Sequence, residues 1–220
     1  LHACSMTSIH LGKLSSELIL WSSNLAGLFK VHEEYSTGSS IMPQKRNPDS
    51  LELIRSKANI IRSKSQEFSN IISNLPLTYF KDFQEDKKII FECFDELSIC
   101  LNVMSDVIKK SNFNKEIGFE LCETNFATAT DLADYLVIEK NIPFRKSYKT
   151  IADIVQYASS HKIKLSEISL KEFQNFEKSI KSDIYQYIDI KKSLARKKTS
   201  MSTNPKEVIK NIRRFKKFLK

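Results

Sequence analysis

The residues best suited to chemistry lie in one polar loop, which runs from Gly38 to Asp49. One glycine and two prolines constrain its backbone, which favours a loop of defined shape. Between them the loop carries two serine hydroxyls, a carboxamide, a lysine, an arginine and an asparagine. Cations and amides can hold a carboxylate, and a hydroxyl beside a cation can exchange a proton, so this set is capable of chemistry on a carboxylic acid.

The same loop has simpler interpretations. A phosphate-binding P-loop is excluded, because the first glycine of that pattern is absent and no glycine precedes Lys45. A polar loop that only caps the following helix, with Asp49 or Asn47 near the helix N-terminus, stays open. Composition alone does not separate this capping role from a catalytic one.

The order of the residues is more specific than their composition. The run Gly-Ser-Ser-Ile-Met-Pro-Gln-Lys-Arg-Asn-Pro, residues 38–48, resembles the signature of the fumarase/aspartase superfamily of lyases. Gln44, before the lysine, resembles the argininosuccinate lyase branch, and residues 79–87 and 129–136 with 143–145 are similar to that branch too. The resemblance covers nearly the whole chain, but it corresponds to only about the second half of a family member.

The resemblance implies a carbon–nitrogen lyase that eliminates fumarate from argininosuccinate and leaves arginine, without a cofactor or metal. This reaction removes a proton from a carbon beside a carboxylate, and the carbanion places two negative charges on one group. By position in the signature, Ser39 matches the catalytic base. Lys45 and Asn47 match the residues that hold the doubly charged group. Glu52 matches the carboxylate that orients a histidine on the acid side.

The resemblance also implies a set of substrate contacts, which match Gln44, Tyr79, Gln84 and Lys87. Without the resemblance, the last three would be interpreted as capping and solvated residues. Glu52 alone would be a glutamate favoured by the helix dipole.

The composition predicts long helices for the rest of the chain, because the whole sequence has only 4 glycines and 5 prolines in 220 residues. Apolar residues recur every three or four positions over 1–29, 49–72 and 90–108, which predicts three long helices. The seams of the first and third are Leu11, Leu14, Leu18, Trp21, Leu25 and Leu28, and Ile90, Phe94, Leu97, Leu101, Met104 and Ile108. We expect an all-α protein, with no strands, built on a long-helix bundle of the fumarase/aspartase type.

The sequence pattern changes at residues 111–114, from long helices to shorter ones, and this change predicts a boundary between two domains. Residues 1–112 form the helical bundle with the signature loop 36–49, and residues 113–220 form a small α-helical domain. In the second domain we expect shorter helices at 127–140, 147–160, 166–180 and 205–219, with a loop at 191–204. The last helix is amphipathic with a basic outer face.

Two places depart from the pattern of the resembling family. Met201-Ser202 stand where the family usually has a pair of glycines, and Ser147-Tyr148 stand where it usually has histidines or similar residues. Both departures concern the loops of the second domain and neither touches the signature.

Charge and cysteines limit the partners. The net charge of +9 comes from lysines spread along the chain, so a solvated surface is favoured over a nucleic-acid site. No apolar run approaches the roughly 18 residues of a membrane helix. Cys4, Cys93 and Cys100 fall in apolar helical patterns and read as reduced core residues of a cytoplasmic protein, and no zinc-like pairing is visible.

The resemblance implies a homotetramer in which three segments from three subunits build each site. No stretch of this chain resembles the family's Thr-His segment or its Ser-Ser-Asn segment. We therefore expect a chain that is inactive alone and that assembles as a homotetramer or with a missing N-terminal half. Two alternatives stay open, a non-catalytic helical oligomerisation module and another fumarate-releasing lyase of the superfamily.

Overall fold

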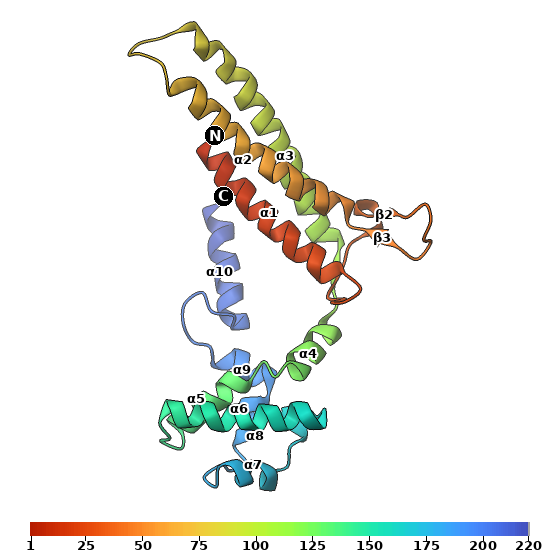
Figure 1. Ribbon diagram of the computed structural model, residues 1–220, viewed down its shortest axis with the longest axis vertical. Helices are drawn as coiled ribbons and strands as arrows, with labels where there is room; N and C mark the ends of the chain where they lie inside the picture. The colour runs from red at the N-terminus through yellow and green to blue at the C-terminus, as the bar shows by residue number, and fades with distance from the viewer. Residues whose placement is uncertain (220) are drawn as a thin grey trace. The chain divides into compact units, whose positions relative to one another are not determined.

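The computed structural model describes residues 1–219 and divides the chain into two compact units, Leu1–Lys115 and Glu116–Lys220 (Figure 1). The boundary expected from the sequence, after residue 112, lies three residues before this division. Helices supply almost all of the regular structure, which confirms the predicted all-α class. No helix among the described residues is long and apolar enough to cross a membrane.

The first unit is a bundle of three long helices, α1 (His2–Ser22), α2 (Asp49–Ile72) and α3 (Asp86–Lys110). Single 3-10 turns occur at Glu33–Tyr35 and Lys81–Glu85. Ion pairs from Lys57 to Glu96 and from Lys64 to Glu92 join α2 and α3, the latter at 2.9 Å, and their order along the chain makes these two helices antiparallel.

Helices α1 and α2 approach closely because small residues face each other. A Cβ added at Gly12 would lie 3.3 Å from the Cβ of Ala58. The buried face of α1 also carries Ser5, Ser8 and Ser15, which occupy little space. Around this contact the core is formed mainly by Leu11, Leu18, Leu51, Ile54, Ile61, Cys93, Leu97, Cys100 and Met104. Cys4, Cys93 and Cys100 are free and buried, as predicted.

Two details of the predicted helices were wrong. The first helix ends at Ser22 rather than near residue 29, because Ser23 adopts an extended backbone and Leu25 is almost fully exposed. In α3 the expected seam was only partly right, since Leu97 and Met104 are buried as predicted but its other positions are displaced by one residue. Ile89, Cys93 and Cys100 are buried, whereas Phe94, Leu101 and Ile108 of the expected seam are exposed.

The predicted absence of strands was also wrong, although the strands are only two residues long. They are β1 (Phe29–Lys30), β2 (Thr37–Gly38), β3 (Arg46–Asn47) and β4 (Asn112–Phe113). β1 pairs with β4 and β2 pairs with β3, both antiparallel. Segments this short carry no detectable alternation, so tertiary contacts decide their pairing.

The second unit contains the shorter helices α4 (Lys115–Thr124), α5 (Ala129–Ile138), α6 (Phe144–His161), α7 (Leu170–Phe176), α8 (Ile184–Ile188), α9 (Ile190–Arg196) and α10 (Pro205–Phe218), with a 3-10 turn at Leu165–Glu167. Its core packs α5, α6 and α8 around Leu132, Leu136, Ile154 and Ile184. The helix expected at 166–180 is shorter, and α9 lies where a loop was expected.

Helix α9 forms because its ends have partners that the local sequence does not reveal. Asp189 caps it by accepting a hydrogen bond from the Lys192 N–H at 2.9 Å. At the other end, Arg196 and Lys197 reach the buried Asp131 of α5 at 3.4 and 2.9 Å. Burial acts to raise the pKa of the Asp131 carboxyl, but its hydrogen bonds with Ser193 and Lys197 outweigh burial and the pKa is lowered.

The residues of the second unit that differ from the family pattern lie in different local environments. Met201 adopts a φ of 65°, the left-handed region that favours glycine, at a position where the resemblance predicts a glycine. Ser147 is buried and donates to the Ile142 carbonyl at 3.3 Å, whereas Tyr148 is exposed. Helix α10 follows the expected bounds closely, but its apolar face, with Ile212 and Phe215, is exposed.

The buried Ser15 hydroxyl lacks a hydrogen-bond partner among the described residues. Replacing Ser15 with alanine should therefore raise the free energy of unfolding of the first unit by about 1 kcal/mol. Urea unfolding followed by the fluorescence of Trp21 measures this change. Ser8→Ala is the matched control, since Ser8 is equally buried but donates to the Ser5 carbonyl at 2.8 Å. A Ser15→Ala protein no more stable than the parent would contradict this view of the helix contact.

Candidate active site

The signature residues form a small β-hairpin at the N-terminal end of α2, and it projects from the side of the bundle (Figure 1). Thr37 lies opposite Asn47 and Gly38 opposite Arg46. One more backbone hydrogen bond, from the Ser39 N–H to the Lys45 carbonyl at 3.3 Å, extends this pairing. Residues 40–46 at the tip are exposed.

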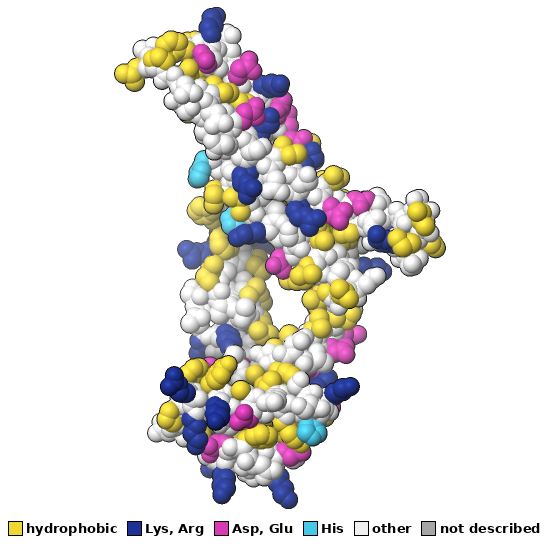
Figure 2. All heavy atoms as spheres, in the orientation of Figure 1, with side chains coloured by type: hydrophobic (Ala, Val, Ile, Leu, Met, Phe, Trp, Pro, Cys, Tyr) yellow, Lys and Arg dark blue, Asp and Glu magenta, His cyan; other side chains and the backbone are white. Residues whose placement is uncertain are grey.

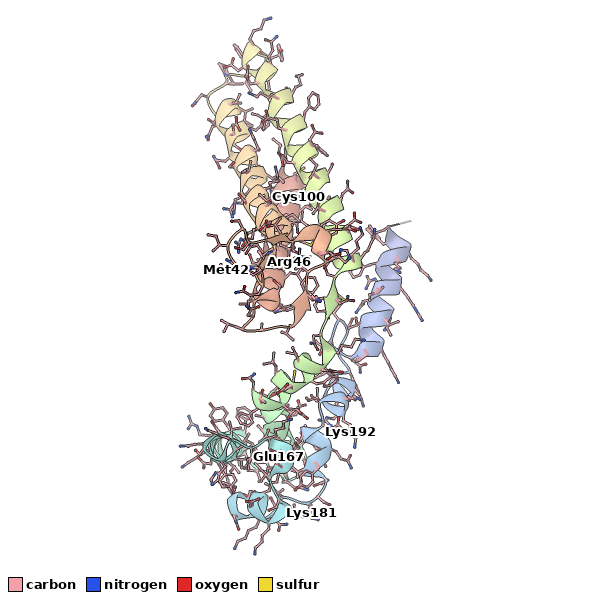
Figure 3. The ribbon with its side chains drawn as sticks, turned by 90° about the vertical axis from the view of Figure 1, so that its right-hand side faces the viewer. Met42, Arg46, Cys100, Glu167, Lys181 and Lys192 are labelled. Atoms are coloured by element: carbon pink, nitrogen blue, oxygen red, sulfur yellow. The ribbon has the colours of Figure 1, made fainter. Side chains whose placement is uncertain are left out.

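The register of this hairpin sorts the signature residues onto two faces. Residues opposite each other in an antiparallel pair project to the same face, and successive residues project to opposite faces. Ser39, Lys45 and Asn47 therefore share one face, which we call the signature face. Gln44 and Arg46 belong to the other face, where they line a cleft with Ser36 and Pro48. Figure 3 looks toward the side from which the hairpin projects and labels Met42 and Arg46.

The Ser39 side chain has a defined hydrogen-bond environment. Its half-buried Oγ accepts hydrogen bonds from the backbone N–H groups of Ile41, at 3.2 Å, and Met42, at 3.0 Å. Two backbone donors aimed at one oxygen favour its deprotonated form. The arrangement therefore suits a hydroxyl that gives up its proton more easily than an ordinary serine.

The hairpin is attached to the bundle by polar contacts that were not predicted from the sequence. Thr37 donates a hydrogen bond to Asp49 in the first turn of α2. The Ser50 hydroxyl donates to the Tyr35 carbonyl at 2.7 Å. The only signal for these contacts was the presence of short hydroxyl side chains on both sides of a helix start. Glu52 lies in the same first turn, and its side chain is exposed.

The expected cap of α2 differs from the observed one. Pro48 is the N-cap residue and makes no side-chain capping hydrogen bond, while Asp49 is the first helical residue. The loop is therefore not a simple capping loop, and its asparagine is free for another role, since Asn47 makes no side-chain hydrogen bond among the described residues.

The second predicted set lies where the connection from α2 enters α3. The Tyr79 ring stacks on Phe83 with centroids 5.9 Å apart, and Gln84 is exposed. Lys87 contacts Asp86 at 2.7 Å, and this hydrogen bond raises the pKa of the lysine ammonium. None of these three residues lines the cleft beside the hairpin.

The structure does not bring the two predicted sets together. Helix α2 has 24 residues, and at 1.5 Å per residue it spans about 36 Å between the hairpin at one end and the connection at the other. Figure 2 shows hydrophobic side chains gathered at both places, where Ile41 and Leu77 are among the most exposed apolar residues. A small substrate held by Ser39 of one chain is out of reach of Lys87 of the same chain.

The Ser39 contacts make a prediction about the hairpin tip. Ser39→Ala removes the acceptor, so the Ile41 and Met42 amides should exchange with solvent about threefold to tenfold faster, as measured by NMR hydrogen exchange. Ser40→Ala is the control, because Ser40 is exposed and makes no side-chain hydrogen bond in the described chain. Equal effects of both changes would show that Ser39 does not order the tip. We also predict that residues 35–47 are mobile without a ligand, because the polar groups of such a loop lack partners until a carboxylate binds.

Comparison with known proteins gives consistent matches. A family model described as "Argininosuccinate lyase C-terminal" matches residues 126–195, and one described as "Lyase" matches residues 1–62. An argininosuccinate lyase of Pelagibacter ubique is 37% identical over 217 residues, which are 99% of this chain and 47% of that protein. One of Nitratiruptor is 40% identical over 211 residues, 96% of this chain and 46% of that protein.

Solved structures agree with this. An EDDS lyase in complex with formate is 25% identical, with a TM-score of 0.85 over 95% of this chain and 43% of that one. A 3-carboxy-cis,cis-muconate lactonizing enzyme from Pseudomonas putida, at 14% identity and a TM-score of 0.66 over 84% of this chain and 42% of that one, shares the fold. The chain spans about half the length of the curated relatives it matches. It belongs to the argininosuccinate lyase family of the fumarase/aspartase superfamily and corresponds to the C-terminal half of its members.

Proposed function

We propose that this chain supplies the proton-abstraction part of an argininosuccinate lyase site, in which fumarate is eliminated from argininosuccinate to give arginine. The observation that carries the proposal is the pair of backbone N–H donors on Ser39 Oγ, on the same hairpin face as Lys45 and Asn47. These three residue types provide a base, a positive charge and a directed amide.

The chemistry follows from this arrangement. Ser39, as the alkoxide, takes the proton from the carbon beside a substrate carboxylate, and the two N–H donors lower the cost of holding that charge. Electrons then move into the carboxylate, which gains a second negative charge. Lys45 provides the opposite charge for this group and Asn47 a hydrogen bond. The carbon–nitrogen bond breaks, and the leaving nitrogen takes a proton from an acid.

The acid and the remaining contacts come from other chains in this proposal. No stretch of the 220 residues resembles the Thr-His segment, so in this proposal the histidine oriented by Glu52 lies outside these residues. Tyr79, Gln84 and Lys87, about 36 Å along α2 from Ser39, serve the site of a neighbouring chain. Gln44, on the opposite hairpin face from Ser39, is the weakest of the proposed substrate contacts.

Exposed apolar surface on the bundle supports such an assembly. Leu53 and Ile60 of α2 and Phe91, Phe94 and Ile99 of α3 are each about half exposed or more. Apolar side chains along two long helices mark an interface. A homotetramer, or an assembly with chains that carry the N-terminal half of the family, would cover them.

The two other candidate functions share much of this surface. A non-catalytic oligomerisation module would need the apolar helices but would not need two N–H donors on Ser39. Another fumarate-releasing lyase would use the same base with a different leaving group. The two lyase functions therefore differ in the substrate that they act on and not in the base.

Subunit complementation tests the proposal. The chain alone should release no fumarate from argininosuccinate. Mixed with a full-length family member whose own matching serine is alanine, it should restore fumarate release, followed by ultraviolet absorbance. General base catalysis is worth about a hundredfold to ten-thousandfold, so the rescue is easily measured.

The controls separate the residue from the fold. Ser39→Ala in this chain should abolish the rescue, and Ser40→Ala should preserve it, with the mass of the assembly unchanged in both. Rescue that survives Ser39→Ala would reject the assigned base. Release of fumarate from a different amino-acid adduct, but not from argininosuccinate, would favour the second lyase function.

A further inference from the structure

The face of the hairpin opposite to Ser39, Lys45 and Asn47 lines a cleft. The cleft has a volume of about 620 Å³, within the usual range for small-molecule sites. Its walls lie entirely within the first unit. They are the end of α1 with residues 22–27, the β1–β4 pair, and the face of the hairpin that carries Gln44 and Arg46.

The charge of the cleft is one-sided. Lys30 on β1 and Arg46 on β3 bring two cations to the lining of the cleft, and none of the described residues that line it is acidic. Neither cation makes an ion pair within residues 1–219, although many other lysines of this chain do. The side-chain amides of Asn24, Asn112 and Gln44 add hydrogen-bond donors that carry no charge.

The cleft also has an apolar floor. Phe29 is buried and packs against Phe113, with ring centroids 4.8 Å apart, and both line the cleft with Val31 and Pro48. An arginine fork matches a carboxylate in two hydrogen bonds, and the apolar residues suit a short carbon skeleton. The combination favours a small organic carboxylate over inorganic phosphate.

We infer that the cleft between β1 and the signature hairpin binds a small organic carboxylate, held by Lys30 and Arg46. Such a ligand joins β1 and β3, which are not paired with each other, since β1 pairs with β4 and β3 pairs with β2. It therefore restrains the hairpin against the bundle while the signature face stays free. The binding itself does not depend on the proposed reaction; its effect on Ser39 and Lys45 rests on that proposal.

Trp21 provides a local probe. It is the only tryptophan of the sequence, and its ring meets Phe113 edge to face at 5.9 Å. Succinate added at constant ionic strength should change the Trp21 emission and saturate, with an affinity that calorimetry reproduces. Inorganic phosphate at the same ionic strength should bind at least about tenfold more weakly, because it cannot use the apolar floor.

Matched variants decide the location. Lys30→Gln and Arg46→Gln should each weaken succinate binding by about tenfold or more, the usual effect of losing a charge-assisted hydrogen bond. Lys13→Gln makes the same charge change on α1, at an exposed residue that does not line the cleft, and should leave the affinity within about twofold. Circular dichroism confirms that each variant is folded.

Three results would overturn the inference. These are no succinate binding by either method up to about 10 mM, phosphate binding as tight as succinate binding, and a loss in Lys13→Gln equal to that in Arg46→Gln. None of them bears on Ser39 or on complementation, so failure here and failure of the proposed function are distinguishable.

Discussion

The antiparallel pairing of Thr37–Gly38 with Arg46–Asn47 is the contact on which the arrangement of this site depends. With a period of two, a shift of one residue in this register would turn every side chain of β3 to the other face. The observed register places Ser39, Lys45 and Asn47 together and sends Arg46 to the cleft. Contacts at the start of α2, from Thr37 to Asp49 and from Ser50 to Tyr35, hold the hairpin at this helix.

The length of α2 imposes the second constraint. A straight helix of 24 residues keeps its two ends about 36 Å apart, and no change in the conformation of the loops alters this distance. One end carries the signature face and the other carries Tyr79 and Lys87. One small substrate therefore cannot reach both sets within one chain. The exposed apolar side chains of α2 and α3 are consistent with this need for partners.

The sequence predicted the architecture better than its details. Long helices were evident because apolar residues recur over many turns, and the signature could be placed at a helix start because its prolines and glycine interrupt that pattern. The buried face of α3 was misjudged by one residue, since aromatic residues such as Phe94 look like core but are exposed here. Helix α9 was missed because Asp131, which is far away in the sequence, anchors its end.

The division of the hairpin residues between two faces could not be predicted from the sequence either. Strands of two residues leave no periodic signal, so the division between Lys45 and Arg46 became visible only with the register. The same holds for the two N–H donors on Ser39, which depend on the turn that follows it. The residue types suggested proton transfer near a carboxylate, and the geometry of the turn gives Ser39 a physical reason to lose its proton.

The central claim is that this chain carries one part of a lyase site which other chains must complete. The most direct measurement titrates the chain with the separately produced N-terminal half of a family relative, such as that of Pelagibacter ubique, and follows fumarate release from argininosuccinate. The account predicts no release from either part alone and a rate that rises until the two are equimolar. Release from this chain alone, or no release from a mixture whose mass shows that it has assembled, would contradict it.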